Sequence, residues 1–238
     1  HDLFTRGVDQ SGRLRPPYED APELYKESEL GWIPKEWEVR YVSDVSSMIT
    51  SGSRGWARYY STSGAIFVRI GNLTRHHINF RWDDIQHVEP PQSAEGERTR
   101  LEEHDLLISV TADLGIIAIV PPDMGDAYIN QHIALVRLRR DDVNSRWVGH
   151  FLAGTNGRYQ FERLSDVGAK AGLNLPTVGS LSFLYPTLSE QNQLVEIVDG
   201  LDEQVQIEQK QLAKSRKLKT GLMQDLLTGK VRVSVDET

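Results

Sequence analysis

The segment from Pro186 to Lys230 constrains the fold of this chain more than any other part of the sequence. It opens with a proline and a capping-box pattern, Thr187-x-x-Glu190, and it closes at Thr228-Gly229, where glycine suits the left-handed residue beyond a helix end. Close to forty residues lie between these two signals. The pattern predicts one helix about 57 Å long, at about 1.5 Å per residue.

A single apolar stripe runs along this predicted helix. It is interrupted at Glu208 and changes phase before its last three leucines. A helix cannot bury one stripe against itself, so the stripe needs a partner helix, and the sequence predicts an antiparallel coiled coil. The predicted helix-pairing residues are Leu194, Val198, Leu201, Val205, Leu212, Leu218, Leu222 and Leu226.

The end of the predicted helix has a near copy at the start of the chain. HDLFTRGV (residues 1–8) and QDLLTGKV (residues 224–231) share four of eight positions, and Phe4 is matched by Leu227. The copies are 223 residues apart, which leaves room for one globular domain and one helix per repeat. We interpret residues 1–8 as the end of a preceding helix; a chance match is the alternative. Because the first residue is His rather than Met, we expect the numbering to begin inside a longer reading frame or after an engineered boundary.

Three segments follow from composition and pattern. Residues 1–30 are rich in Gly, Pro and charge and are predicted to be an irregular arm, comprising the end of a preceding repeat and a linker. Residues 31–187 mix short β-branched runs with turns, and residues 188–238 contain the long helix and a short tail. The predicted fold class is α+β, with a mixed β-sheet domain followed by one long helix. The predicted strands are 65–73, 105–110, 115–120 and 133–138, and a helix over 145–164 is predicted to be interrupted between Gly154 and Gly157.

Composition excludes several classes of protein. The longest apolar run, Leu114 to Val120, is far too short to cross a bilayer. The sequence shows no secretory signal, and the absence of cysteine excludes disulfides and thiolate metal sites. We therefore expect a cytoplasmic protein.

Charge is distributed unevenly along the chain. The net charge of −7 taken alone argues against a nucleic-acid binder. Residues 45–82, however, contain no Asp or Glu and five arginines. Because DNA affinity comes mostly from neutralised phosphates, this acid-free segment is the natural candidate for a DNA contact.

Four stretches together resemble one known family. They are LYKESELGWIPKEWEV (24–39), ITSGSRGWARYYSTSGAIFVRIGNL (49–73), HDLLISVTADLGIIAIV (104–120) and the helix with its flanks, YPTLSEQNQLVEIVDGLDEQV (185–205) and LKTGLMQDLLTGKVRV (218–233). With the repeated octapeptide, they resemble the carboxyl-terminal half of a type I restriction–modification specificity subunit. A full subunit of that family holds two target recognition domains, separated by two antiparallel helices, and each domain reads half of a split DNA target.

The resemblance implies a non-catalytic chain without a cofactor of its own. It implies one target recognition domain over residues 31–187 that reads one half-site of double-stranded DNA. The helix would dock a methyltransferase subunit, which would carry the methyl donor, and the full complex would add a translocase–nuclease subunit. We expect a homodimer through the long helix when the chain is alone. The alternative is a truncated interaction module that assembles with the methyltransferase without reading DNA.

Candidate DNA contacts come from side-chain chemistry. Arg and Asn are suited to bidentate reading of guanine and adenine, and Gly52, Gly55 and Gly64 are predicted to let the backbone approach a phosphate. Trp56 and Tyr59 are either DNA contacts or packing aromatics. The predicted DNA-binding residues are Ser53, Arg54, Trp56, Arg58, Tyr59, Arg69, Asn72, Arg75, Lys170 and Asn174.

Catalytic alternatives lack their required residues. RPPY (15–18) has Arg where an amino-methyltransferase needs a hydrogen-bond acceptor. A PD-(D/E)xK nuclease needs a lysine near its acids, and no lysine occurs between Lys35 and Lys170. The seven histidines lack the spacing of zinc ligands. The sequence therefore predicts a DNA reader with no catalytic residues and no metal site.

Overall fold

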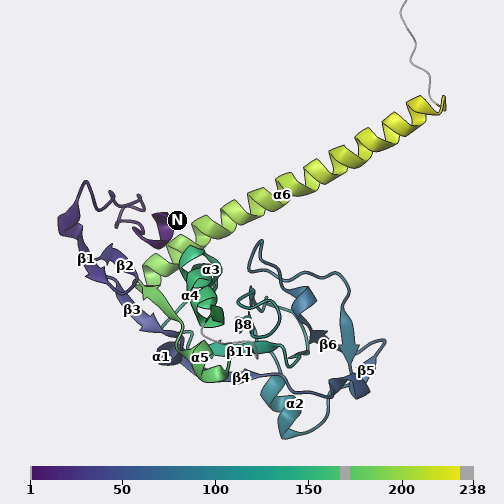
Figure 1. Cartoon of the computed structure of the whole chain (residues 1–238), viewed down its shortest axis with the longest axis horizontal. Coiled ribbons are helices and arrows are strands. Elements are labelled where there is room, and N and C mark those ends of the chain that lie inside the picture. Colours follow the sequence, from purple (N-terminus) through teal and green to yellow (C-terminus); the bar gives the residue numbers. More distant parts are fainter. Residues whose placement is uncertain (1, 167–171, 231–238) are drawn as a thin grey trace, which may run out of the picture. The chain divides into compact units, whose positions relative to one another are not determined.

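The computed structural model describes residues 2–166 and 172–230, and Figure 1 shows the order of the elements along the chain. The chain divides into two compact units, residues 1–195 and 196–238. Among the described residues, no helix is both long enough and apolar enough to cross a membrane. Lys170, one of the predicted DNA contacts, lies outside the described residues.

The central sheet of the first unit is antiparallel, with the order β4–β11–β8–β9. Its strands are β4 (Ser46–Ser51), β8 (Leu106–Ser109), β9 (Ile117–Ile119) and β11 (Ile133–Leu138). Alternate side chains of β8 enter two different cores: Leu106 and Ile108 join the larger one, and Leu107 joins the second. A strand buried on both faces is mostly apolar, which explains the runs that predicted β8, β9 and β11, in which Ser109 and Arg137 are the polar exceptions.

A second sheet is mixed, with the order β10–β6–β7–β5. It contains β5 (Tyr60–Ser61), β6 (Ala65–Val68), β7 (Gln86–Val88) and β10 (Ala127–Ile129). Strands β6 and β10 run parallel, whereas the other pairs are antiparallel. The predicted strand over 65–73 is shorter than expected, since a 3₁₀ turn, η4 (Ile70–Asn72), follows β6.

An early and a late segment of the first unit are joined by strand pairing. β3 (Glu38–Tyr41) pairs antiparallel with β12 (Ser182–Tyr185), and a hairpin of β1 (Tyr25–Ser28) and β2 (Gly31–Pro34) precedes it. The hairpin begins inside the arm predicted to be irregular to residue 30. The ring of Tyr25 is buried and its hydroxyl donates a hydrogen bond to the carbonyl of Pro16 (2.5 Å), which fixes the start of this strand.

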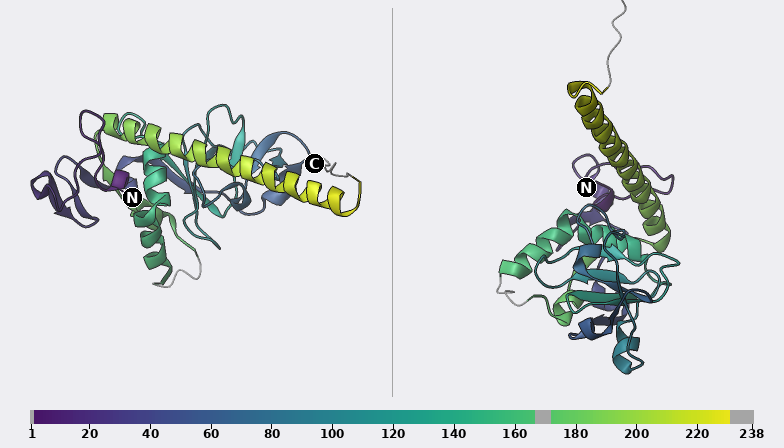
Figure 2. Two further views of the ribbon diagram at one scale, coloured as in Figure 1. Left: turned by 90° about the horizontal axis from the view of Figure 1, so that it is seen from above. Right: turned by 90° about the vertical axis from the view of Figure 1, so that its right-hand side faces the viewer.

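Short helices cover the sheets. α3 (Ser145–Ala153) lies against β8 and β9, and α4 (Thr155–Asp166) follows it; both are among the teal-green helices of Figure 2. The break between them at Gly154 lies inside the predicted interruption. α3 begins at Asn144, whose side chain accepts hydrogen bonds from the N–H groups of Arg146 and Trp147. The remaining short elements are α1 (Val42–Val45), α2 (Ala94–Thr99), α5 (Leu175–Gly179), η1 (Asp2–Phe4), η2 (Pro22–Leu24) and η3 (Trp56–Tyr59).

The long helix is present as α6 (Leu188–Leu227), and with the mixed sheets it confirms the α+β fold class. Gly229 has φ +72°, the left-handed conformation that the sequence predicts beyond the helix end. Of the two hydrogen bonds in the predicted capping box, only the one to Thr187 is formed, and the prediction for Glu190 is wrong. Thr187 Oγ1 accepts a hydrogen bond from the N–H of Glu190 (3.3 Å), but the Glu190 carboxylate binds Val8, Arg15 and Trp37 instead of returning to Thr187.

The first turns of α6 belong to the first unit. Leu194 is fully buried in the larger core of that unit. Leu194 therefore leaves the set of residues predicted to pair with a second helix, because its own domain already covers it. The residues from Leu201 to Leu226 of the predicted stripe are each about half exposed.

Candidate nucleic-acid interface

The loop between β4 and β6 starts with a close approach of two backbones. A Cβ placed on Gly52 would lie 2.2 Å from the backbone of Asn130, so only glycine fits there. The next residue, Ser53, forms an isolated parallel β-bridge with Asn130. The prediction that Gly52 leaves room for a phosphate is therefore wrong, because the backbone of Asn130 fills that space.

Trp56 anchors this loop from the inside. Its side chain is 2% exposed and stacks on Phe67, with 5.2 Å between the ring centroids. The indole Nε1 donates a hydrogen bond to Glu95 Oε1 at 2.8 Å. Trp56 is thus a packing aromatic, one of the two possibilities left open by the sequence, and its burial removes it from the candidate DNA contacts.

Arg54 and Arg58 project from the same loop into solvent. Both are exposed, and Gly55 between them has φ +84° with open space where a Cβ would be. The Arg58 guanidinium lies over the ring of Tyr59, 4.8 Å from its centroid. Because Trp56 is fixed in the core, this turn holds its flanking arginines at the surface. We call residues 53–59 the arginine loop.

Arg98, which the sequence analysis missed, supports the start of the arginine loop. It lies on α2, and its guanidinium donates to the side chains of Thr50 and Ser53 (2.6 Å to Ser53 Oγ) and to the carbonyl of Ser51 (2.5 Å). Since Arg98 lies outside the acid-free segment and next to Glu97, no local pattern could have indicated this contact.

Arg69 and Arg75 each form an ion pair with an aspartate. Arg69 Nη2 lies 3.0 Å from Asp84 Oδ2, and Arg75 forms a two-pronged pair with Asp113, with 3.3 Å between Nε and Oδ2. The acids come from outside residues 45–82, so folding partly neutralises the acid-free segment. Exposed ion pairs of this kind contribute about 0–1 kcal/mol, which is small enough for a phosphate to replace the acid.

Two predicted asparagine contacts have structural roles. Asn72 is buried; its Oδ1 accepts from the N–H of Arg69 (3.0 Å) and its Nδ2 donates to the carbonyls of Arg81 and Asp83. The prediction that Asn72 reads a base is therefore wrong. Asn174 is exposed but caps α5 by accepting from the N–H of Thr177 (2.8 Å), and α5 packs on α1 and β4.

One carboxyl group with a raised pKa, that of Asp105, lies at the edge of the central sheet, directly before β8. Burial raises the pKa of Asp105, although hydrogen bonds from Arg137 (2.8 and 2.9 Å) and from the N–H of Glu102 (2.7 Å) oppose that rise. These donors use both carboxylate oxygens, so Asp105 ties the start of β8 to β11 and has a structural role. No group of three or more His, Asp or Glu side chains that could hold a metal occurs within residues 2–166 and 172–230.

Comparison with known proteins decides the family. The model described as "Type I restriction modification DNA specificity domain" matches residues 34–215, which is most of the chain. The chain belongs to this family. The match covers both the arginine loop of this specificity domain and the first two-thirds of α6.

Two curated relatives of the specificity-domain chain come from Methanocaldococcus jannaschii. One is the putative type I restriction enzyme MjaX specificity subunit, 23% identical over 97% of this chain and 49% of the relative. The other is the type I restriction enzyme MjaVIII specificity subunit, 22% identical over 97% of this chain and 52% of the relative. The chain thus spans about half the length of the curated relatives it matches.

Solved structures support the fold of the specificity domain. A chain from a structure of the type I R-M system, described for its complex assembly and conformational transition, matches with a TM-score of 0.57 and 18% identity. That match covers 87% of this chain and 49% of the other. The HsdS subunit from Thermoanaerobacter tengcongensis matches with a TM-score of 0.52 and 19% identity, over 87% of this chain and 48% of that subunit.

Proposed function

We propose that this chain is a non-catalytic DNA sequence-specificity unit that reads one half of a bipartite target. The observation that carries the proposal is the arginine loop. In a domain of the DNA specificity family, Arg54 and Arg58 stand exposed on either side of a glycine turn that Trp56 holds in place. A basic turn anchored in this way can neutralise phosphates and reach base edges. It also loses less conformational entropy on binding than an unanchored loop would.

The long helix supports the second part of the proposal. Leu201, Val205 and Leu212 form an apolar strip along α6 and are each about half exposed in the single chain. We propose that two copies pair antiparallel through this strip, so that each contributes one DNA-reading domain to a symmetric target. We further propose that the helix and its flanks dock a methyltransferase subunit, which holds the methyl donor, within a complex that also has a translocase–nuclease subunit.

A second function has one observation in its favour. Several predicted DNA contacts are occupied within the chain: Trp56 and Asn72 are buried, and Arg69 and Arg75 bind acids. A chain of this kind could serve as an assembly module that docks the methyltransferase without reading DNA. The two functions differ in whether the arginine loop has to contact DNA.

Replacing Arg54 or Arg58 with alanine is expected to weaken DNA binding about tenfold each, since one arginine contact to a phosphate or base contributes roughly 1–3 kcal/mol. The chain is co-expressed with a cognate methyltransferase subunit, and the methylated sites are mapped first. Affinity of the purified complex for a duplex containing the mapped site is then measured at fixed salt.

Arg13→Ala is the matched control, because Arg13 is a highly exposed arginine of the N-terminal segment. It is expected to leave affinity and methylation unchanged. If both loop variants bind and methylate like the parent, the arginine loop does not read DNA, and the assembly-module function takes its place.

A further inference from the structure

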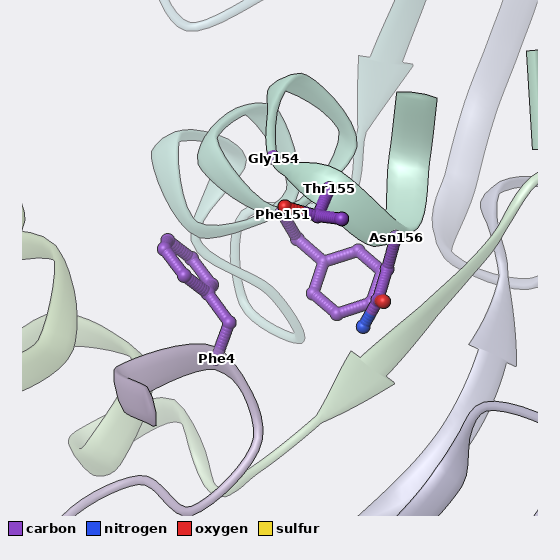
Figure 3. Close-up of a pocket in the computed structure, with 5 residues that line it drawn as sticks. All are labelled: Phe4, Phe151, Gly154, Thr155 and Asn156. Carbon is purple, nitrogen blue, oxygen red and sulfur yellow. The ribbon is translucent and has the colours of Figure 1, made fainter. Parts of the chain in front are cut away.

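Residues 2–8 occupy a defined site on the first unit. Phe4 stacks on Trp147 with 5.2 Å between ring centroids and meets Phe151 edge-on at 6.4 Å. Figure 3 shows Phe4 facing Phe151 across a small pocket at the junction of α3 and α4. We call the residues that hold this segment, Trp37, Trp147, Phe151 and Glu190, the helix-end site.

Glu190 supplies the polar half of the helix-end site. Its carboxylate is almost fully buried and accepts hydrogen bonds from the N–H of Val8 (3.0 Å) and from Trp37 Nε1 (2.9 Å). Arg15 binds the same carboxylate with both terminal nitrogens, at 2.5 and 3.3 Å. Because Glu190 lies in the first turn of α6, these bonds tie the start of the chain to the start of its longest helix (Figure 1).

The bound segment has the conformation of a helix end. The N–H of Arg6 donates to the carbonyl of Asp2 (2.8 Å), and Gly7 follows with φ +61°. The end of α6 has a similar turn, since the N–H of Thr228 donates to the carbonyl of Gln224 (3.0 Å) and Gly229 follows with φ +72°, although its glycine stands one position earlier than Gly7 when the two octapeptides are matched. The helix-end site therefore shows how this unit receives the last turn of a helix.

The chain carries a second segment of the same chemistry. Leu226 and Leu227 stand where the first copy has Leu3 and Phe4, between the same Asp and Thr. Leu227 is 83% exposed at the end of α6. Leu227 is thus an exposed apolar side chain in the sequence position of Phe4, which packs on Trp147. The helix-end site is therefore a candidate binding site for Leu227.

The stripe of α6 indicates how the second segment would arrive there. Two pairs of its apolar positions lie at equal distances from Glu208: Val198 and Leu218 are each ten residues from it, and Leu194 and Leu222 are each fourteen residues from it. An antiparallel pair in that register places Glu190 opposite Leu226, since each lies eighteen residues from the midpoint. The tail of one copy then reaches the helix-end site of the other.

We propose that the tail of a second copy, Leu226–Thr228, competes with residues 2–8 for the helix-end site. The inference rests on the antiparallel pairing in the proposed function and goes beyond it by naming the residues that close each end of the pair. The helix-end site would thus have two alternative ligands, one from its own chain and one from the partner chain.

The two occupants differ in fit. A Cβ on Gly7 would lie 2.2 Å from Trp37 Cζ2 and 2.3 Å from Glu190 Oε1, whereas the matching position of the tail is Lys230. The likeness is therefore interrupted after Thr5 and Thr228, and Lys230 cannot take the place of Gly7 beside Trp37 and Glu190. Residues 2–8 are the better ligand, so the tail docks fully only when they are loosened.

Disulfide trapping tests this competition, because the chain contains no cysteine. A chain with Asn156→Cys, at the pocket beside Phe4, is mixed with a size-tagged chain carrying Leu227→Cys, and the mixture is oxidised. Only a contact between two copies gives the mixed disulfide. Adding Phe4→Ala to the first chain is expected to raise its yield at least fivefold, because the competing segment loses its stacked ring.

Lys219→Cys replaces Leu227→Cys in the control, since it lies about 12 Å away along the helix, at about 1.5 Å per residue. Should Phe4→Ala unfold the chain, Phe4→Leu, which copies the tail's own residue, carries the test with an expected twofold rise. An unchanged yield, or an equal yield from the control, overturns the inference. Light scattering separates the two proposals: a dimer without the disulfide leaves antiparallel pairing intact, whereas a monomer overturns both.

Discussion

Replacing Glu190 with alanine is expected to lower the free energy of unfolding of the first unit by about 3 kcal/mol. The carboxylate holds Arg15, Trp37 Nε1 and the N–H of Val8, and all of these donors lose their acceptor together. The Arg15 side chain is only 15% exposed, so its charge would stay partly buried without a counterion. Removing one member of such a pair costs more than the pair itself contributes, because the remaining charge is left uncompensated.

Urea unfolding monitored by tryptophan emission measures this effect, since Trp37 and Trp147 both lie in the core of the first unit. Glu196→Ala is the matched control, because Glu196 is an exposed carboxylate near the start of the same helix. We expect the control to change the free energy of unfolding by less than about 0.5 kcal/mol. An equal and small effect of both substitutions would show that the carboxylate at position 190 contributes no more than a surface acid.

Replacing Val205 and Leu212 together with glutamate is expected to convert the proposed dimer into a monomer. Both residues lie on the exposed apolar strip of α6, and the paired helices would bury four new carboxylates near one another. A charge at a buried position without a partner costs several kcal/mol, and four such charges together oppose the apolar burial that holds the two helices. Light scattering after size-exclusion chromatography gives the mass directly.

Ile207→Glu is the control for this variant. Ile207 is an exposed apolar residue of the same helix, and two residues of helical rotation place it about 200° from Val205. The substitution has the same chemistry on the opposite face, and we expect it to leave the dimer unchanged. If the stripe variant remains dimeric, or if Ile207→Glu dissociates the dimer as well, then the strip around Val205 is not the pairing surface.

The long helix and the strands were predictable from the sequence because their signals are local. The predicted boundaries at Thr187 and Gly229 enclose α6, and the run over 133–138 coincides with β11. A helix stop is recorded in one glycine, and a strand buried on both faces is recorded in an unbroken apolar run. These elements can be recognised from neighbouring residues in the sequence, without knowledge of their tertiary contacts.

The contacts of single polar side chains were not predictable in the same way. Asn72 and Asn174 have the amide chemistry of a base reader, yet one closes a turn and the other caps a helix. Trp56 carries the same ambiguity, which only the position of Phe67 resolves. Arg98 and Glu190 show the converse, since each contacts residues that lie more than forty positions away in the sequence. Residue type defines what a side chain can bind, whereas tertiary structure decides which partner reaches it first.

Glu208, which interrupts the apolar stripe at the middle of α6, affects the choice between like and unlike partners. When two identical helices cross a two-fold axis at their midpoints, the residue on the axis meets itself, and here two carboxylates would face one another. Like charges about 4 Å apart repel by roughly 1–4 kcal/mol near a protein surface. A helix of different sequence, with Lys or Gln at that level, would avoid this repulsion. The acid at the centre of the helix therefore weakens the proposed homodimer without preventing it, and a related chain with Lys or Gln at that level would form the more stable mixed pair.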